Sequence, residues 1–178
     1  TLVSLPLSFN IAFATALVPA ITSAKTTGDM ETGRKRVSFS LLVTMLIGFP
    51  CMIGMMIFAQ PILNLLFPNA PDGAFIFQIS ALAIIFTVLE QTVNGALQGL
   101  GKIMVPAIAL SIGVGLKLIL NLVLVPIPSI GAAGAAFATV ACHAVAFFIG
   151  FNVLRANMKL GLSFSKFVAK PVLATIMM

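Results

Sequence analysis

The chain has 178 residues, of which 60% are hydrophobic and only 8% are charged, and its mean hydropathy is +1.17. A soluble domain is about one quarter charged, so this sequence could not cover a globular surface, and lipid must face much of it. The formal net charge of +6 does not indicate nucleic-acid binding, because the basic residues fall between apolar runs, where they set membrane topology.

Five segments are long and apolar enough to cross a bilayer as helices, since a span needs about 20 apolar residues. A helix satisfies its own backbone hydrogen bonds in lipid, and these runs are too long and not alternating enough for β-barrel strands. The sequence therefore predicts an all-α transmembrane bundle. The spans are expected at 2–22, 38–60, 75–100, 104–126 and 131–154, with a sixth at 167–178.

Both ends of the chain indicate a truncation. The first residue is Thr1, and the last apolar run stops at Met178 before it is long enough to span a bilayer. We therefore expect residues 1–178 to be one fragment of a single transmembrane domain.

The basic residues predict the orientation of the spans. Nine of the ten lie in alternate connections, and the intervening loops at 67–74 and 127–130 have none. By the positive-inside rule the basic side is cytoplasmic. The loops expected in the cytoplasm are 23–37, 100–104 and 155–166.

Three ionisable residues lie inside the predicted spans, where they are costly and therefore point to function. These are Glu90, Lys117 and His143, on three different helices. At about 1.5 Å per residue, they lie about 15, 20 and 16 Å from the cytoplasmic ends of their helices. We expect them at comparable depth, near the middle of the membrane.

Polar residues extend two of these helices into stripes. Glu90, Asn94 and Gln98 share one face at four-residue spacing, with Gln91 beside them, and Lys117 has the same spacing to a second asparagine. Several such stripes at matching depth predict a wet substrate cavity. The residues predicted to line it are Lys117, Glu90, Asn94, Gln91, Asn121, His143 and Asn10.

Structural interpretations of the same residues stay open. Glu90 and Lys117 could neutralise each other as an ion pair, and His143 could be a hydrogen-bonded packing residue. Gln91 and Asn94 could serve as hydrogen bonders between helices. Small residues at 95–99, in a G-x-x-x-G pattern, and at 131–136 predict faces where helices approach closely.

The sequence shows no catalytic constellation. Asp29 and Asp72 both lie in loops, and the single histidine has no partner motif. No nucleophile elbow, Walker A motif or Cys/His metal spacing is present. We therefore expect a transporter rather than an enzyme, with no cofactor and no metal site.

Several short runs resemble those of bacterial lipid-linked oligosaccharide flippases. Their order and spacing are similar to the stage V sporulation protein B and polysaccharide-biosynthesis branch of the MATE-like flippase superfamily. The runs are LPLSFNIAFATALVPAIT at 5–22, AQPILNLLF at 59–67, QGLGK at 98–102 with Val105-Pro106, LNL at 120–122 before Pro126, GAAGAA at 131–136 and Lys170-Pro171.

This resemblance implies a fourteen-helix protein of the bacterial plasma membrane, with two six-helix lobes around a central cavity. The chain would hold helices eight to twelve and the start of the thirteenth. The implied substrate is a polyprenyl diphosphate carrying sugars, such as a peptidoglycan precursor, moved by alternating access with H⁺ or Na⁺ as the coupling ion. Lys117 would attract the diphosphate, and Glu90 would position it or couple to the ion. The expected partners are this lipid-linked saccharide and membrane lipids, without nucleic acid.

Two other functions remain open. A cation-coupled multidrug antiporter of the same superfamily would favour an acidic cavity, whereas this part of the protein sets Lys117 and His143 against Glu90. A non-transporting scaffold for cell-wall synthesis would need these charges only for folding.

Overall fold

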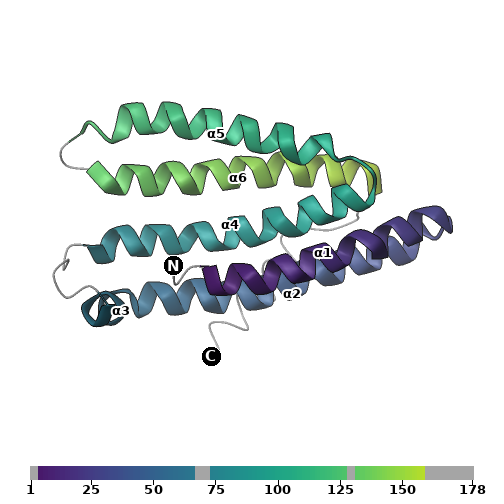
Figure 1. Cartoon of the computed structure of the whole chain (residues 1–178), viewed down its shortest axis with the longest axis horizontal. Coiled ribbons are helices and arrows are strands. Elements are labelled where there is room, and N and C mark those ends of the chain that lie inside the picture. The colour runs from purple at the N-terminus through teal and green to yellow at the C-terminus, as the bar shows by residue number, and fades with distance from the viewer. Residues whose placement is uncertain (1–3, 67–72, 128–130, 159–178) are drawn as a thin grey trace.

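The computed structural model describes residues 4–66, 73–127 and 131–158, and these residues form helices joined by short turns, without strands. The predicted all-α fold class is therefore confirmed. Figure 1 shows the elements in chain order. They are α1 (Ser4–Thr26), α2 (Met30–Ile57), α3 (Ala59–Leu66), α4 (Gly73–Gly99), α5 (Met104–Leu124) and α6 (Gly131–Met158).

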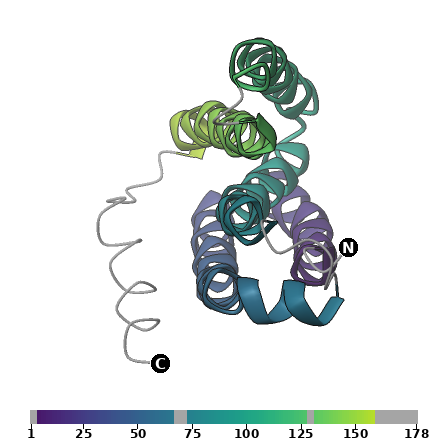
Figure 2. The same cartoon turned by 90° about the vertical axis from the view of Figure 1, so that its left-hand side faces the viewer.

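Helix α4 forms the centre of the bundle. It packs on α6 on one side and on α1 and α2 on the other, while α5 lies outermost and contacts mainly α6 (Figures 1 and 2). The main apolar core lies between α1, α2, α4 and α6, with the side chains of Val37, Val93, Leu97 and Leu154 fully buried in it. Large apolar side chains of α5 remain exposed, as expected of a surface that faces lipid.

Four helices in the described part of the chain are long and apolar enough to cross a membrane: α2, α4, α5 and α6. The protein is thus a multi-pass membrane helix bundle. Helix α1 has 23 residues and covers most of the predicted span 2–22, but it is not among these four, so its crossing stays a prediction. The sixth predicted span, 167–178, lies outside the described residues.

The predicted cytoplasmic loop at 23–37 is much shorter than expected. Helix α1 continues to Thr26 and α2 begins at Met30, so only residues 27–29 connect them. Gly28 turns the chain with a φ of 74°, and the carboxylate of Asp29 accepts the backbone N–H of Thr32 at 3.1 Å. This cap satisfies a free N–H at the helix start. Of the basic residues in the predicted loop, Lys25 therefore lies on the last turn of α1, and the other three lie on the first turns of α2.

The predicted span 38–60 is not one straight helix. Helix α2 ends at Ile57, and after Phe58 the chain turns into α3, which lies across the end of the bundle (Figure 2). Pro61 fits here because the first turn of a helix needs no backbone N–H from it. The other end of α2 also differs, since the helix starts eight residues before the predicted span.

The last two spans are close to their predicted positions. Helix α5 ends two residues before the predicted boundary, and α6 continues to Met158, four residues beyond it. Residues 155–158 are thus helical instead of part of the predicted loop 155–166, and residues 159–166 lie outside the described part.

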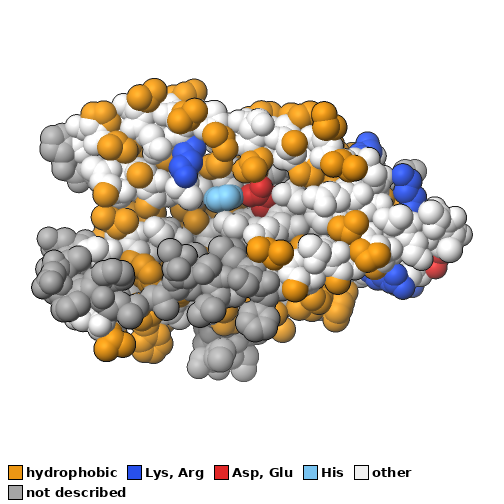
Figure 3. Space-filling view, viewed as in Figure 1, with side chains coloured by type: hydrophobic (Ala, Val, Ile, Leu, Met, Phe, Trp, Pro, Cys, Tyr) orange, Lys and Arg blue, Asp and Glu red, His pale blue; other side chains and the backbone are white. Residues whose placement is uncertain are grey.

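The described basic residues, apart from Lys117, gather at one end of the bundle (Figure 3). There the ammonium of Lys25 donates to the carbonyl of Leu100 at 2.8 Å, and the guanidinium of Arg36 donates to the carbonyl of Ala20 at 3.1 Å. Cations favour helix C-termini, and Lys25 thus joins the end of α1 to the end of α4, while Arg36 joins α2 to α1. The single basic end agrees with the predicted topology, and its cytoplasmic location stays a prediction.

Glycines allow the close helix contacts that the small-residue patterns predict. A Cβ on Gly95 would lie 2.5 Å from the carbonyl oxygen of Ala14, and one on Gly99 would lie 2.8 Å from the Cβ of Ile21. Helices α1 and α4 can therefore approach only because both residues are glycine. Gly113 does the same for α5, since its Cβ would lie 2.6 Å from the carbonyl oxygen of Cys142 on α6.

Candidate functional site

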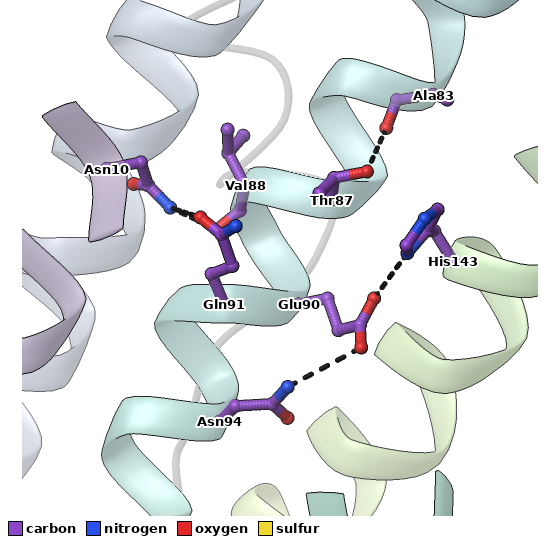
Figure 4. A network of polar contacts seen from close by, with 8 residues as sticks. All are labelled: Asn10, Ala83, Thr87, Val88, Glu90, Gln91, Asn94 and His143. Carbon is purple, nitrogen blue, oxygen red and sulfur yellow. Dashed lines mark hydrogen bonds and ion pairs between the residues drawn. The ribbon is translucent and has the colours of Figure 1, made fainter. Parts of the chain in front are cut away.

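Polar side chains in the middle of α4 point in opposite directions (Figure 4). Gln91 points toward α1, whereas Glu90 and Asn94 point toward α6. Neighbouring residues of a helix differ by about 100° in direction, so Glu90 and Gln91 reach different helices. The residues predicted as one cavity lining are therefore divided between two sides of α4.

On the side of α1 and α2 lies an uncharged group of four side chains, which we call the amide–hydroxyl network: Asn10, Thr44, Gln91 and Thr92. The amide nitrogen of Asn10 donates to the carbonyl of Val88 at 2.9 Å and to Oε1 of Gln91 at 3.0 Å. Its Oδ1 accepts the Thr44 hydroxyl at 3.2 Å, and the Thr44 and Thr92 hydroxyls are 2.9 Å apart. The network joins α1, α2 and α4.

The sequence analysis missed the two threonines of this network. Thr44 and Thr92 stand alone in apolar runs, and a threonine can satisfy its hydroxyl on its own helix, as Thr92 does on Val88 at 3.0 Å. The available signal was their position, because each lies well inside a predicted span at a depth close to that of Asn10 or Glu90.

On the side of α6, Glu90 makes a close polar contact with His143. Oε2 of Glu90 lies 2.7 Å from Nδ1 of His143, and the exposed fractions of the two side chains are 7% and 26%. The amide of Asn94 donates to Oε1 of Glu90 over a long 3.5 Å. Within the described residues no hydrogen bond or ion pair joins Glu90 to Lys117, so His143 is the partner that Glu90 has.

Helix α5 adds two polar side chains, Lys117 and Asn121. Both follow Gly113 at four-residue spacing, so they lie along the face of α5 that contacts α6. Lys117 is half-buried and makes no ion pair within the described part of the chain. Oδ1 of Asn121 is buried and also lacks a hydrogen-bond partner there.

Figure 3 shows a basic, a histidine and an acidic side chain side by side on one face of the bundle, away from its ends. In the sequence, Lys117, His143 and Glu90 lie in the interiors of α5, α6 and α4. Glu90 and His143 are in contact and so lie at the same level of the bundle, while the predicted depth of the three residues in the membrane stays a prediction.

Two cavities adjoin the polar residues. A groove of about 220 Å³ between α1 and α4 is lined by Gln91, Asn94 and Gln98 together with small and apolar residues. A second cavity of about 200 Å³ between α1 and α2 is lined by Asn10 and Thr44 and is otherwise apolar. Neither lining includes the four residues on the α5 and α6 side, so a shared substrate cavity stays a prediction. Those four are Glu90, His143, Lys117 and Asn121.

Comparisons with known proteins assign the whole chain to a family. A family model described as "Lipid II flippase MurJ" matches residues 1–178. The "Uncharacterized membrane protein YabM" of Bacillus subtilis (strain 168) is 30% identical over 170 residues. That match covers 96% of this chain and 31% of the relative, so the chain spans about a third of the relative's length. The predicted flippase superfamily is thereby confirmed.

Proposed function

The chain belongs to the lipid II flippase MurJ family, and on this premise we propose that it is part of a membrane transporter that flips a polyprenyl-diphosphate-linked saccharide, such as a peptidoglycan precursor, across the bacterial plasma membrane. The chain spans about a third of the relative's length, so the activity of a whole transporter is part of this proposal. Alternating access is the mode of transport.

Lys117 is the observation that carries this proposal. A charged side chain inside a membrane span is costly, and it usually pairs with an opposite charge or faces a ligand pathway. Oε2 of Glu90 lies 2.7 Å from Nδ1 of His143, and in the described residues the ammonium of Lys117 has no ion-pair partner. A diphosphate supplies the missing negative charge.

Asn121 supports the same side of the bundle as the binding side. Its Oδ1 is buried without a partner within the described helices, and such an atom costs free energy until something donates to it. A sugar hydroxyl or an ordered water is a suitable donor. Asn94 and Gln91, which line the groove on the other side of α4, are proposed as further substrate contacts, together with Asn10 behind them.

A multidrug antiporter is the second candidate function. The observation that favours it is the buried carboxylate of Glu90, because an acidic group in the membrane attracts cationic drugs. The His143 side chain blocks one carboxylate oxygen, which weakens this candidate. A non-transporting scaffold for cell-wall synthesis is the third candidate. The sporulation role implied by the resemblance of the sequence runs is also kept as a proposal.

Movement of a labelled polyprenyl-diphosphate saccharide by the intact parent protein in proteoliposomes tests the proposal. Lys117→Gln should abolish movement at equal folded amount, whereas Lys102→Gln, at the exposed basic end, should retain it. Export of a cationic dye without movement of the lipid would replace the flippase with the antiporter. Absence of both activities would favour the scaffold.

A further inference from the structure

The groove between α1 and α4 has two walls of different chemistry. The wall from α4 carries the carboxamides of Gln91, Asn94 and Gln98, which follow one another at steps of three and four residues and so share one face of the helix. The wall from α1 is mainly apolar, with Ile11 and Val18 at its two ends. None of the described residues that line the groove carries a charge.

A close contact between the two helices closes the floor of this groove. Gly95 lies between Asn94 and Gln98 on α4, and a Cβ at this position would lie 2.5 Å from the carbonyl oxygen of Ala14 on α1. Backbone therefore packs against backbone beneath the carboxamides. A ligand cannot pass between α1 and α4 at this level, so it lies in the groove against both walls.

The carboxamides of Gln91 and Gln98 have hydrogen-bonding capacity that the described part of the chain does not use. Oε1 of Gln91 accepts from Asn10 at 3.0 Å (Figure 4), but Nε2 of Gln91 donates to no described residue. The side chain of Gln98 is exposed and makes no hydrogen bond within the described residues. A carboxamide offers two N–H donors and a carbonyl acceptor, so free donors and a free acceptor lie about 10 Å apart along α4.

The cavity between α1 and α2 lacks this free capacity. Its polar lining residues are Asn10 and Thr44, and these are already bonded to each other and to the rest of the amide–hydroxyl network. The two cavities have similar volumes of about 200 and 220 Å³, so they differ in chemistry and not in size. Of the two, the groove between α1 and α4 is the one that offers hydrogen bonds to a ligand.

An uncharged group with hydroxyls at its edge and an apolar face fits these two walls. A neutral carboxamide has no charge to attract a phosphate or a cation, but it both donates to and accepts from a hydroxyl. Pockets for whole small molecules have volumes of about 300–1,000 Å³, so the groove of about 220 Å³ holds one unit of a larger ligand. A sugar ring is such a unit, since its hydroxyls lie at the edge and its C–H groups form a face.

We propose that this groove binds a sugar ring of the lipid-linked substrate, and that Gln98 and Nε2 of Gln91 select a saccharide-bearing lipid over the same lipid diphosphate without sugar. This inference rests on the proposed function and adds residues that determine its specificity. Gln98 is the residue to change first, because its side chain has no internal hydrogen bond whose loss would affect folding.

Binding of two probes to the intact parent protein in lipid nanodiscs tests the proposal. One probe is a polyprenyl diphosphate that carries a disaccharide without peptide, and the other is the same polyprenyl diphosphate without sugar. Gln98→Leu should raise the Kd of the disaccharide probe about 3- to 10-fold, as expected for the loss of a hydrogen bond between neutral groups. The Kd of the sugar-free probe should stay unchanged.

Gln60→Leu is the matched control. It makes the same chemical change on α3, where the exposed Gln60 donates to Asn64 at 3.3 Å and does not line the groove, so both Kd values should stay unchanged. Lys117→Gln should weaken both probes, because both carry the diphosphate. In Gln98→Leu, an unchanged Kd of the disaccharide probe or an equal increase for both probes would overturn the proposal. An effect of Gln98→Leu that needs a peptide on the disaccharide would overturn it as well.

The same variants separate this inference from the proposed function. A protein whose binding of the disaccharide probe depends on Gln98 as predicted, but which moves no lipid in proteoliposomes, retains the saccharide site and refutes the flippase. A protein that moves the lipid with the same apparent KM in Gln98→Leu as in the unmodified form retains the flippase and refutes the saccharide site. A protein that binds neither probe refutes both.

Discussion

The two sides of α4 bury polar groups in different ways. Toward α1 and α2, the side chains of the amide–hydroxyl network are uncharged, and each has a hydrogen-bond partner between 2.9 and 3.2 Å away. The side toward α6 and α5 includes three ionisable side chains, and within the described part Lys117 has no ion-pair partner and Oδ1 of Asn121 has no hydrogen-bond partner.

This difference indicates that polar side chains within one turn of α4 have different roles, mainly structural on one side and mainly functional on the other. A satisfied network of neutral groups in lipid stabilises helix association, with roughly 1 kcal/mol from each bond. A buried charge or a buried acceptor without a partner costs free energy, so such a group is kept where a ligand satisfies it. We infer that the α1–α2 side mainly stabilises the bundle and adds secondary substrate contacts, whereas the α5–α6 side supplies the main substrate contacts.

The largest effect is expected from a substitution at the closest contact between α1 and α4. In Gly95→Leu the new side chain would begin 2.5 Å from the backbone of Ala14, so α1 must move away from α4 and the network must open. We expect a loss of several kcal/mol, beyond the usual 1–3 kcal/mol of overpacking, because the neighbour is backbone. The folded yield of the intact protein in detergent measures it.

Gly115→Leu on α5 is the matched control for this change. A Cβ on Gly115 would meet nothing within 4 Å, so the same substitution should leave the folded yield unchanged. Equal losses in the two variants would show that the added apolar bulk, and not the close contact, is responsible.

An asparagine-to-leucine substitution on each side of α4 compares the two sides. Asn10→Leu leaves the Thr44 hydroxyl and Oε1 of Gln91 without their shared partner, which should destabilise the protein by about 1–2 kcal/mol. Lipid movement per folded molecule should fall much less than with Lys117→Gln. Thermal unfolding in detergent gives the first quantity.

Asn121→Leu should have the opposite sign. It replaces a side chain whose Oδ1 is buried without a partner in the described helices, so stability should be unchanged or rise by about 1 kcal/mol. Transport should fall, because the proposed ligand contact is lost. A destabilisation as large as that of Asn10→Leu would contradict the distinction between the two sides.

The smallest expected effect lies at the basic end, away from both sides. Hydrogen bonding to Thr32, first through its side chain and then through its backbone N–H, lowers the pKa of Asp29 from its ordinary 3.8. Because the folded-state pKa is lowered, this cap stabilises the protein above about pH 3.8 and is lost as pH falls below that value. Asp29→Ala should therefore lower the melting temperature slightly at neutral pH and not at acidic pH, whereas Asp29→Asn, which keeps an acceptor, should match the unmodified protein at neutral pH.

The sequence predicts the helices well because their signals are local. Helix α4 was expected at 75–100 and occupies Gly73–Gly99, since its apolar run is bounded by turn-forming residues. The close contact of α1 with α4 was also predictable, because the glycines at positions 95 and 99 have no Cβ and can be identified from the sequence alone. The early start of α2 had a signal too, since Asp29 followed by Glu31 is typical of a helix start.

The partners inside the bundle were not predictable in the same way. Whether Glu90 meets His143 or Lys117 depends on how α6 is rotated about its axis, and α6 is small or apolar on all sides, so its sequence does not fix that rotation. The break at Phe58 also has no strong local signal, because Pro61, the nearest helix-restricting residue, follows it by three positions.

Lipid movement by Lys117→Gln and Thr44→Val, side by side in proteoliposomes at equal folded amount, tests the central distinction most directly. The two residues represent the working side and the structural side of α4. We predict that Lys117→Gln loses movement of the labelled polyprenyl-diphosphate saccharide and that Thr44→Val retains most of it. Loss in Thr44→Val with full activity in Lys117→Gln would contradict the assignment of the two sides.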